Sequence, residues 1–177
     1  MTNLNLEIAQ VGNSILRQKA EMVRNIGDEK LQQLIDRLLT TARDANGVGI
    51  AAPQVYQSYR LFIICSRPSP RYPDAPLMEP TAMINPSIIS HSDEIVKGWE
   101  GCLSVPDVRG LVPRYREIIV EYLDRYGESH RQELSDFVAR IFQHELDHLD
   151  GILFIDRVEK SEDLMDKESG EVSQIKS

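Results

Sequence analysis

Two stretches of the chain carry apolar residues at the spacing of an α-helix. In residues 28–45 the apolar positions fall three and four apart, as expected for one face of a helix. Asp28 can cap the start, and Asn46 with Gly47 provides a stop signal. A helix is therefore predicted over 28–45. Its apolar positions are Leu31, Leu34, Ile35, Leu38 and Leu39.

The second stretch is predicted to be a largely buried helix. It begins near Ser135 or Asp136, and Gly151 is a natural C-terminal stop. Its apolar residues cover more than one side of the helix, which indicates packing against several neighbours. They are Phe137, Val138, Ile141, Phe142 and Leu149.

Strands are predicted between and after these helices. β-Branched and aromatic residues favour strands, and Pro86 limits one of them to an edge or a bulge. The predicted strands are 59–65, 83–89, 116–123 and a short 152–158, with a proline-rich surface loop at 68–80 and a turn at 124–128. This order of elements predicts one α+β domain.

The domain is expected to span residues 1–158. Residues 159–177 contain six acidic residues, three lysines and few large apolar side chains. We expect them to form a charged tail that is mobile or at best weakly helical.

Composition narrows the classes of function. The 177 residues are 41% hydrophobic and 27% charged, with a net charge of −8. A strongly acidic chain argues against direct binding of nucleic acid or of an anionic membrane. Residues 1–10 lack the features of a signal peptide, and no apolar run is long enough to span a bilayer. A cytoplasmic protein is expected.

Residues 143–148 read Gln-His-Glu-Leu-Asp-His and lie in the second predicted helix. His144 and His148 are one turn apart, separated by a rise of roughly 6 Å, so both imidazoles can reach one divalent ion. Glu145 would lie beside that ion. Two imidazoles, an adjacent carboxylate and an open coordination position can activate water against a carbonyl.

A catalytic metal of this kind usually has a third protein ligand. His91 and His130 lie in polar turns, and Phe154 stands where a metzincin-like pattern would place a histidine. Glutamates of the acidic tail, such as Glu162 or Glu168, would rest on a weak scaffold.

The two cysteines differ in context. Cys65 ends an apolar run and is expected to be a small buried side chain. Cys102 follows a glycine in the stretch Glu-Gly-Cys-Leu-Ser, outside any predicted strand. Because thiolates are strong ligands for borderline divalent ions, chemistry favours a site of Cys102, His144 and His148 with room for water.

Three stretches together resemble, in order and spacing, the signature motifs of peptide deformylases. They are GVGIAAPQ at 47–54, EGCLS at 100–104 and QHELDH at 143–148. The resemblance extends from about Val11 to Val158. It implies a fold of small, mostly antiparallel sheets packed around a central helix that carries HExxH. It also implies a hydrolase that removes the formyl group from the N-terminal formylmethionine of newly made polypeptides and releases formate.

The resemblance implies a role for each matching residue. Cys102, His144 and His148 would bind the metal, and Glu145 would act as general base and then as acid. The metal would be Fe²⁺, with Ni²⁺ or Zn²⁺ as substitutes. Gln54 and the backbone N–H of Leu103 would stabilise the oxyanion. Gly49, Val48 and Arg109 would contact the substrate.

Two other functions use part of the same pattern. An HExxH metallopeptidase that cleaves internal peptide bonds would leave Cys102 without a role. A blue-copper protein shares the His₂Cys ligand set but has no use for Glu145. The expected partners are formylmethionyl nascent peptides, and the protein is expected to be a monomer. Any ribosome contact would not use the C-terminal segment, because that segment is acidic.

Overall fold

A computed structural model describes residues 6–170. Helix α1 (Glu29–Asp44) matches the helix predicted over 28–45, and the Asp28 carboxylate accepts hydrogen bonds from the backbone N–H groups of Lys30 and Leu31. None of the helices in this range has the length and apolar composition that a membrane-crossing helix needs.

The larger sheet has five antiparallel strands in the order β1-β2-β3-β6-β7. They are β1 (Gly49–Ala51), β2 (Leu61–Ile64), β3 (Thr81–His91), β6 (Glu117–Leu123) and β7 (Ser129–Ser135). The prediction of strands at 59–65, 83–89 and 116–123 is confirmed. Pro86 lies at a register shift between Ile84 and Ser87, which agrees with the predicted bulge.

Strand β2 is buried on both faces, and its alternate residues face different helices. Leu61 and Ile63 pack in one core cluster with the apolar side of α1. Phe62 and Ile64 pack in a second cluster with Phe142 of the other helix. Because side chains alternate across a strand, this short segment separates two cores and fixes both helices.

A second sheet contains three antiparallel strands in the order β4-β5-β8. They are β4 (Ile95–Cys102), β5 (Val105–Tyr115) and β8 (Leu164–Asp166). The sequence did not predict β4 or β5, and Cys102 proves to be the last residue of a strand.

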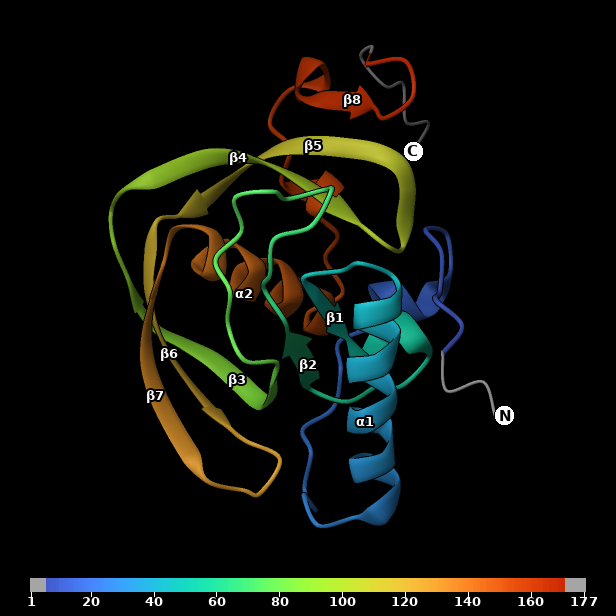
Figure 1. The fold of residues 1–177 in the computed structure, drawn as a ribbon, viewed down its shortest axis with the longest axis vertical. Helices are drawn as coiled ribbons and strands as arrows, with labels where there is room; N and C mark the ends of the chain where they lie inside the picture. The colour runs from blue at the N-terminus through green and yellow to red at the C-terminus, as the bar shows by residue number, and fades with distance from the viewer. Residues whose placement is uncertain (1–5, 171–177) are drawn as a thin grey trace.

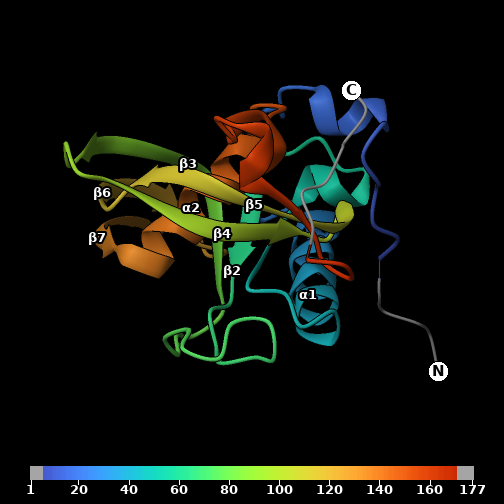
Figure 2. The same ribbon diagram turned by 90° about the horizontal axis from the view of Figure 1, so that it is seen from above.

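Helix α2 (Asp136–Leu149) carries the HExxH residues and lies between the two sheets (Figure 1). Figure 2 shows β4 and β5 covering it from above. The predicted architecture of small antiparallel sheets around a central helix is confirmed. Gly151 follows the helix with φ of +74°. A Cβ there would lie 2.6 Å from the Arg17 carbonyl oxygen, so the backbone conformation at the end of the helix requires glycine.

Two predictions near the C-terminus need correction. The short strand predicted at 152–158 is wrong: Phe154–Arg157 form a 3₁₀-helix, and the Phe154 ring fills the core beneath β5. The segment after residue 159, which was expected to be a mobile tail, is also part of the fold in the described residues. Ser161–Asp163 form another 3₁₀-turn, and β8 pairs with β5 through main-chain hydrogen bonds that need no apolar side chains. Residues 171–177 lie outside the described residues. Further 3₁₀-turns occupy Ser14–Arg17 and Ala52–Val55.

Gly110 offers a test of the packing between β5 and this C-terminal segment. A Cβ at Gly110 would lie 2.8 Å from Val158 Cγ2 and 3.0 Å from Phe154 Cε2. We expect Gly110→Ala to lower the free energy of unfolding by about 1–3 kcal/mol, because overpacking forces neighbours out of position. Gly27→Ala is the control, since its nearest neighbour would lie 3.7 Å away. Urea denaturation compares the two, and equal stability would contradict this packing.

Candidate metal centre

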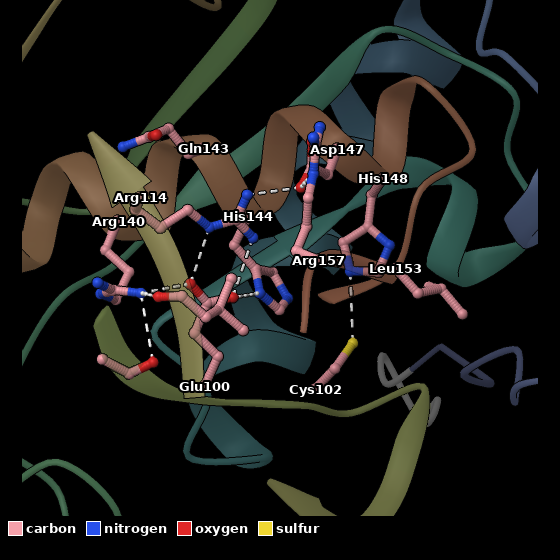
Figure 3. Close-up of polar contacts among 12 residues, drawn as sticks. Glu100, Cys102, Arg114, Arg140, Gln143, His144, Asp147, His148, Leu153 and Arg157 are labelled. Carbon is pink, nitrogen blue, oxygen red and sulfur yellow. Dashed lines mark hydrogen bonds and ion pairs between the residues drawn. The ribbon is translucent and has the colours of Figure 1, made fainter. Parts of the chain in front are cut away.

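Two elements bring the three predicted ligands together. Helix α2 supplies His144 and His148, and the end of β4 supplies Cys102. One ligand atom from each lies within 4.8 Å of the other two, and Cys102 Sγ is 3.4 Å from His148 Nε2 (Figure 3). Ligands of one ion at bond lengths of about 2.0–2.3 Å are on the order of 3.5 Å apart, so the three atoms fit a single cation.

The thiol of Cys102 is set up as a thiolate. Burial alone would raise the pKa of Cys102, but the neighbouring His148 and His144 lower it well below the usual range. Gln54 Nε2 and the backbone N–H of Ser104 also donate to Cys102 Sγ, each at 3.4 Å. A thiolate with two imidazoles is a donor set suited to a borderline transition metal.

Glu100 fixes the orientation of His144. Its Oε2 lies 2.8 Å from His144 Nδ1, so Nδ1 can donate to the carboxylate and leave Nε2 free as a ligand (Figure 3). Burial would raise the pKa of Glu100, yet hydrogen bonds from His144 and Arg114 lower it. Glu100 is thus an ionised carboxylate inside the core, only 4% exposed.

The charge of Glu100 is shared by two arginines. Arg114 donates to both of its oxygens, from Nε at 2.9 Å and from Nη2 at 3.0 Å, and Arg140 Nη1 donates at 2.9 Å. Arg114 Nη1 reaches Asp147 Oδ2 at 2.6 Å, and Arg157 Nη2 reaches Asp147 Oδ1 at 2.8 Å (Figure 3). This network joins β4, β5, α2 and the 3₁₀-helix Phe154–Arg157.

Sequence reasoning assigned no role to Glu100, Arg114, Arg140 or Asp147. Glu100 and Asp147 lie inside the recognised motifs. Their shared partner Arg114 is 14 residues from Glu100 and 33 residues from Asp147 along the chain, so no local pattern marks these pairs.

Glu145 lies close to the cluster and has a perturbed pKa. Burial raises its pKa to about 7, against the opposing effect of His144 and His148. Its Oε2 is buried and has no hydrogen-bond partner among the described residues. A Cβ at Gly49 would collide with Glu145 Oε1 and lie 2.9 Å from its Cδ. The glycine therefore leaves room for the carboxylate itself.

The other predicted residues divide between two places. Val48, Gly49, Gln54 and Leu103 line one pocket with Cys102, His144 and Glu145, and Trp99 forms part of its wall. Gln54 is held by its Oε1, which accepts from the backbone N–H of Ala51 at 2.9 Å. Arg109 does not line this pocket. It lies in an adjacent recess, with its guanidinium carbon 5.6 Å from the centre of the Tyr72 ring.

Comparisons with known proteins agree with this geometry. The family model for polypeptide deformylase matches residues 5–163. The chain belongs to the polypeptide deformylase family. It is therefore a hydrolase that removes the N-formyl group from nascent polypeptides, and the family depends on a metal ion.

Relatives of this deformylase cover most of its length. It is 70% identical over 156 residues to peptide deformylase 2 of a Nostoc species, covering 88% of this chain and 87% of the relative. Peptide deformylase 2 of Shewanella oneidensis is 47% identical over 168 residues, which cover 95% and 92% of the two chains.

Solved structures share the fold. The class I type b peptide deformylase of Acinetobacter baumannii bound to Met-Ala-Ser has a TM-score of 0.86 and 48% identity, covering 89% of this chain and all of that one. A Synechococcus elongatus deformylase in complex with actinonin has a TM-score of 0.79 and 36% identity, with 90% and 82% covered.

Replacing Glu100 tests whether it orients the metal ligand. Glu100→Gln removes the charge that accepts from His144, Arg114 and Arg140. We expect metal affinity to fall by about 10–100-fold, and the free energy of unfolding by about 1–3 kcal/mol. Competition with a chelator and urea denaturation measure the two effects. The control is Glu94→Gln, whose carboxylate forms an exposed ion pair with Arg116. Unchanged metal affinity in Glu100→Gln would contradict the assigned role.

Proposed function

We propose that Cys102, His144 and His148 hold one divalent cation at which this deformylase hydrolyses the formyl group of formylmethionyl peptides. The convergence of the β4 thiol with the two α2 imidazoles carries this proposal. When bound, the ion would supply Lewis acidity toward the formyl carbonyl and toward the attacking water. The remaining steps belong to the protein's own residues.

Glu145 is the proton carrier in this proposal. A carboxyl group with a pKa of about 7 can accept a proton from the attacking water and later give it to the departing α-amine. Its buried Oε2 has no partner within the described residues, so one oxygen is available for water. The products are formate and a peptide with a free N-terminal methionine.

Gln54 and Leu103 are proposed to stabilise the oxyanion. Both line the pocket beside Cys102, and the Gln54 amide is held in place by Ala51 N–H and Ser104 Oγ. Donors that are fixed before the reaction are the most effective at stabilising developing charge. The backbone N–H of Leu103 would supply the second donor.

The same pocket suits an extended peptide with an apolar first side chain. Val48, Phe137 and Ile141 supply apolar lining near the ligands, and we assign them to the methionine side chain. Gly49 would lie along the substrate backbone, where a larger residue would also displace Glu145. Arg109 is proposed to contact the substrate further along, from the adjacent recess.

Of the three classes considered from the sequence, the family match favours the deformylase over the metallopeptidase and the copper protein. We further propose that Fe²⁺ is the native ion. We also propose that the protein is a monomer and that it acts in the cytoplasm, where nascent chains arise. Any ribosome contact would use a face other than the acidic C-terminal segment.

Separate substitutions distinguish proton transfer from metal binding. We expect Glu145→Gln to keep the metal but lose turnover by on the order of 10³-fold, because the amide cannot accept the proton. His148→Ala should lose the metal as well as activity, since two ligands seldom hold a catalytic ion. Metal analysis and formate release from formyl-Met-Ala-Ser measure both effects. Substantial activity in Glu145→Gln would rule out its assigned role.

The identity of the ion can be tested by purification without oxygen. The iron form should lose activity in air, because ferrous iron and the Cys102 thiolate both oxidise. The nickel form should retain activity for longer. Formate release and metal content are measured on the same samples. An air-stable optimum with zinc would contradict iron as the native ion, while cleavage of internal peptide bonds without formate would contradict the function itself.

A further inference from the structure

A second recess lies beside the catalytic pocket and concentrates positive charge. Arg71, Arg109 and Lys167 line it, together with Met165, Asp166 and Gly170. We call it the cationic recess. Its three cations come from the loop between β2 and β3, from β5, and from the residue after β8. Figure 1 shows β8 lying beside β5 and this loop passing in front of α2.

Positive charge exceeds negative charge among the residues that line the cationic recess. None of its three cations forms an ion pair within residues 6–170, whereas Arg17, Arg60 and Arg116 each do. The one carboxylate of the recess, Asp166, accepts the backbone N–H groups of Glu168 and Ser169 at 2.9 Å.

Two further observations favour binding of an anion here. The Nε of Arg109 is buried and has no hydrogen-bond partner among the described residues. Burial lowers the pKa of Lys167, and Arg71 and Arg109 lower it further, against the opposing effect of Asp107 and Cys102. Three cations gathered in a chain of net charge −8 would be stabilised by an acidic ligand.

The cationic recess is continuous with the catalytic pocket. Arg71 lines both, and Tyr72 of the catalytic pocket lies under the Arg109 guanidinium. A Cβ at Gly101, next to the ligand Cys102, would lie 3.8 Å from Lys167 Cε and 3.9 Å from Arg109 Cγ. An extended peptide advances about 3.3 Å per residue, so residues shortly after the formylmethionine would pass the recess.

From this arrangement we infer that the cationic recess is a subsite for a carboxylate of the peptide substrate. The carboxylate is an aspartate or glutamate side chain at the second, third or fourth residue of the nascent peptide. Arg71 and Lys167, together with Arg109, then determine the preference for an acidic residue in the peptide. This inference rests on the proposed function, because the substrate must first place its formyl group at the metal centre.

The test compares peptides that differ only in charge. Formyl-Met-Ala-Ser-amide is the neutral reference, and glutamate or lysine replaces one residue at positions two, three or four. We expect kcat/KM for glutamate at the favoured position to exceed the neutral value on the order of five-fold, and lysine to fall below it. The preference should shrink as salt is added. Equal kcat/KM values at all three positions would overturn the subsite.

Variants of Lys167 separate charge from packing. Lys167→Met keeps an unbranched side chain against Gly101 and should reduce the preference for glutamate by about three-fold. Lys167→Glu should reverse it, so that the lysine peptide becomes the better substrate. Loss of structure alone would not produce that reversal. Lys160→Glu makes the same change of charge outside the recess and should leave the ratio unchanged.

Two controls complete the experiment. Formyl-Met-Ala-Ser with a free terminal carboxylate carries the same chemistry. A gain for this peptide without any gain for glutamate side chains would mean that the recess binds chain ends, which overturns the assignment to nascent peptides. Formate release from the neutral peptide reports on the proposed function separately. If the neutral peptide releases no formate, that function fails. If it is turned over but charge has no effect, only the subsite fails.

Discussion

The ionised carboxylate of Glu100 is the interaction on which the site depends. A buried charge is costly unless other charges and hydrogen bonds surround it. Here Arg114 and Arg140 supply three hydrogen bonds to Glu100 at 3.0 Å or less, and His144 supplies another. Because these partners come from β5 and α2, satisfying the charge of Glu100 forces the smaller sheet and the central helix into one relative position. The proposed metal ligand His144 is oriented by the same requirement.

A cation held by both a strand and a helix, as proposed, would also tie metal binding to folding. Cys102 belongs to the sheet, while His144 and His148 belong to the helix. The three proposed ligands converge only after β4 has packed against α2, so ligation would stabilise that packing by the free energy of binding. The apolar core supplies the first restraint, since Phe142 of α2 packs edge to face on Phe62 of β2.

The parts of the fold with a strong local pattern could be predicted from the sequence, and the rest depends on distant partners. Helices α1 and α2 and strand β2 follow from apolar spacing, and the Cys102, His144 and His148 cluster follows from ligand chemistry. Strands β4 and β5 contain three glycines and two prolines, which disfavour strand formation locally. Arg140 donates to main-chain carbonyls of Val96 and Val112, and such long-range bonds stabilise these strands without a sequence signal.

The spacing of the site follows from a match between two periods. Glu100 and Cys102 are two residues apart in β4, and both side chains contact α2 although the register of the β4–β5 ladder shifts between them. Two residues of a regular strand span about 6.6 Å. His144 and His148 are four residues apart in α2, which is a rise of about 6 Å. Two contacts can therefore form side by side, Glu100 with His144 and Cys102 with His148 (Figure 3). A slip of one residue in β4 would turn both side chains away from α2, so the register of this strand decides whether the site exists.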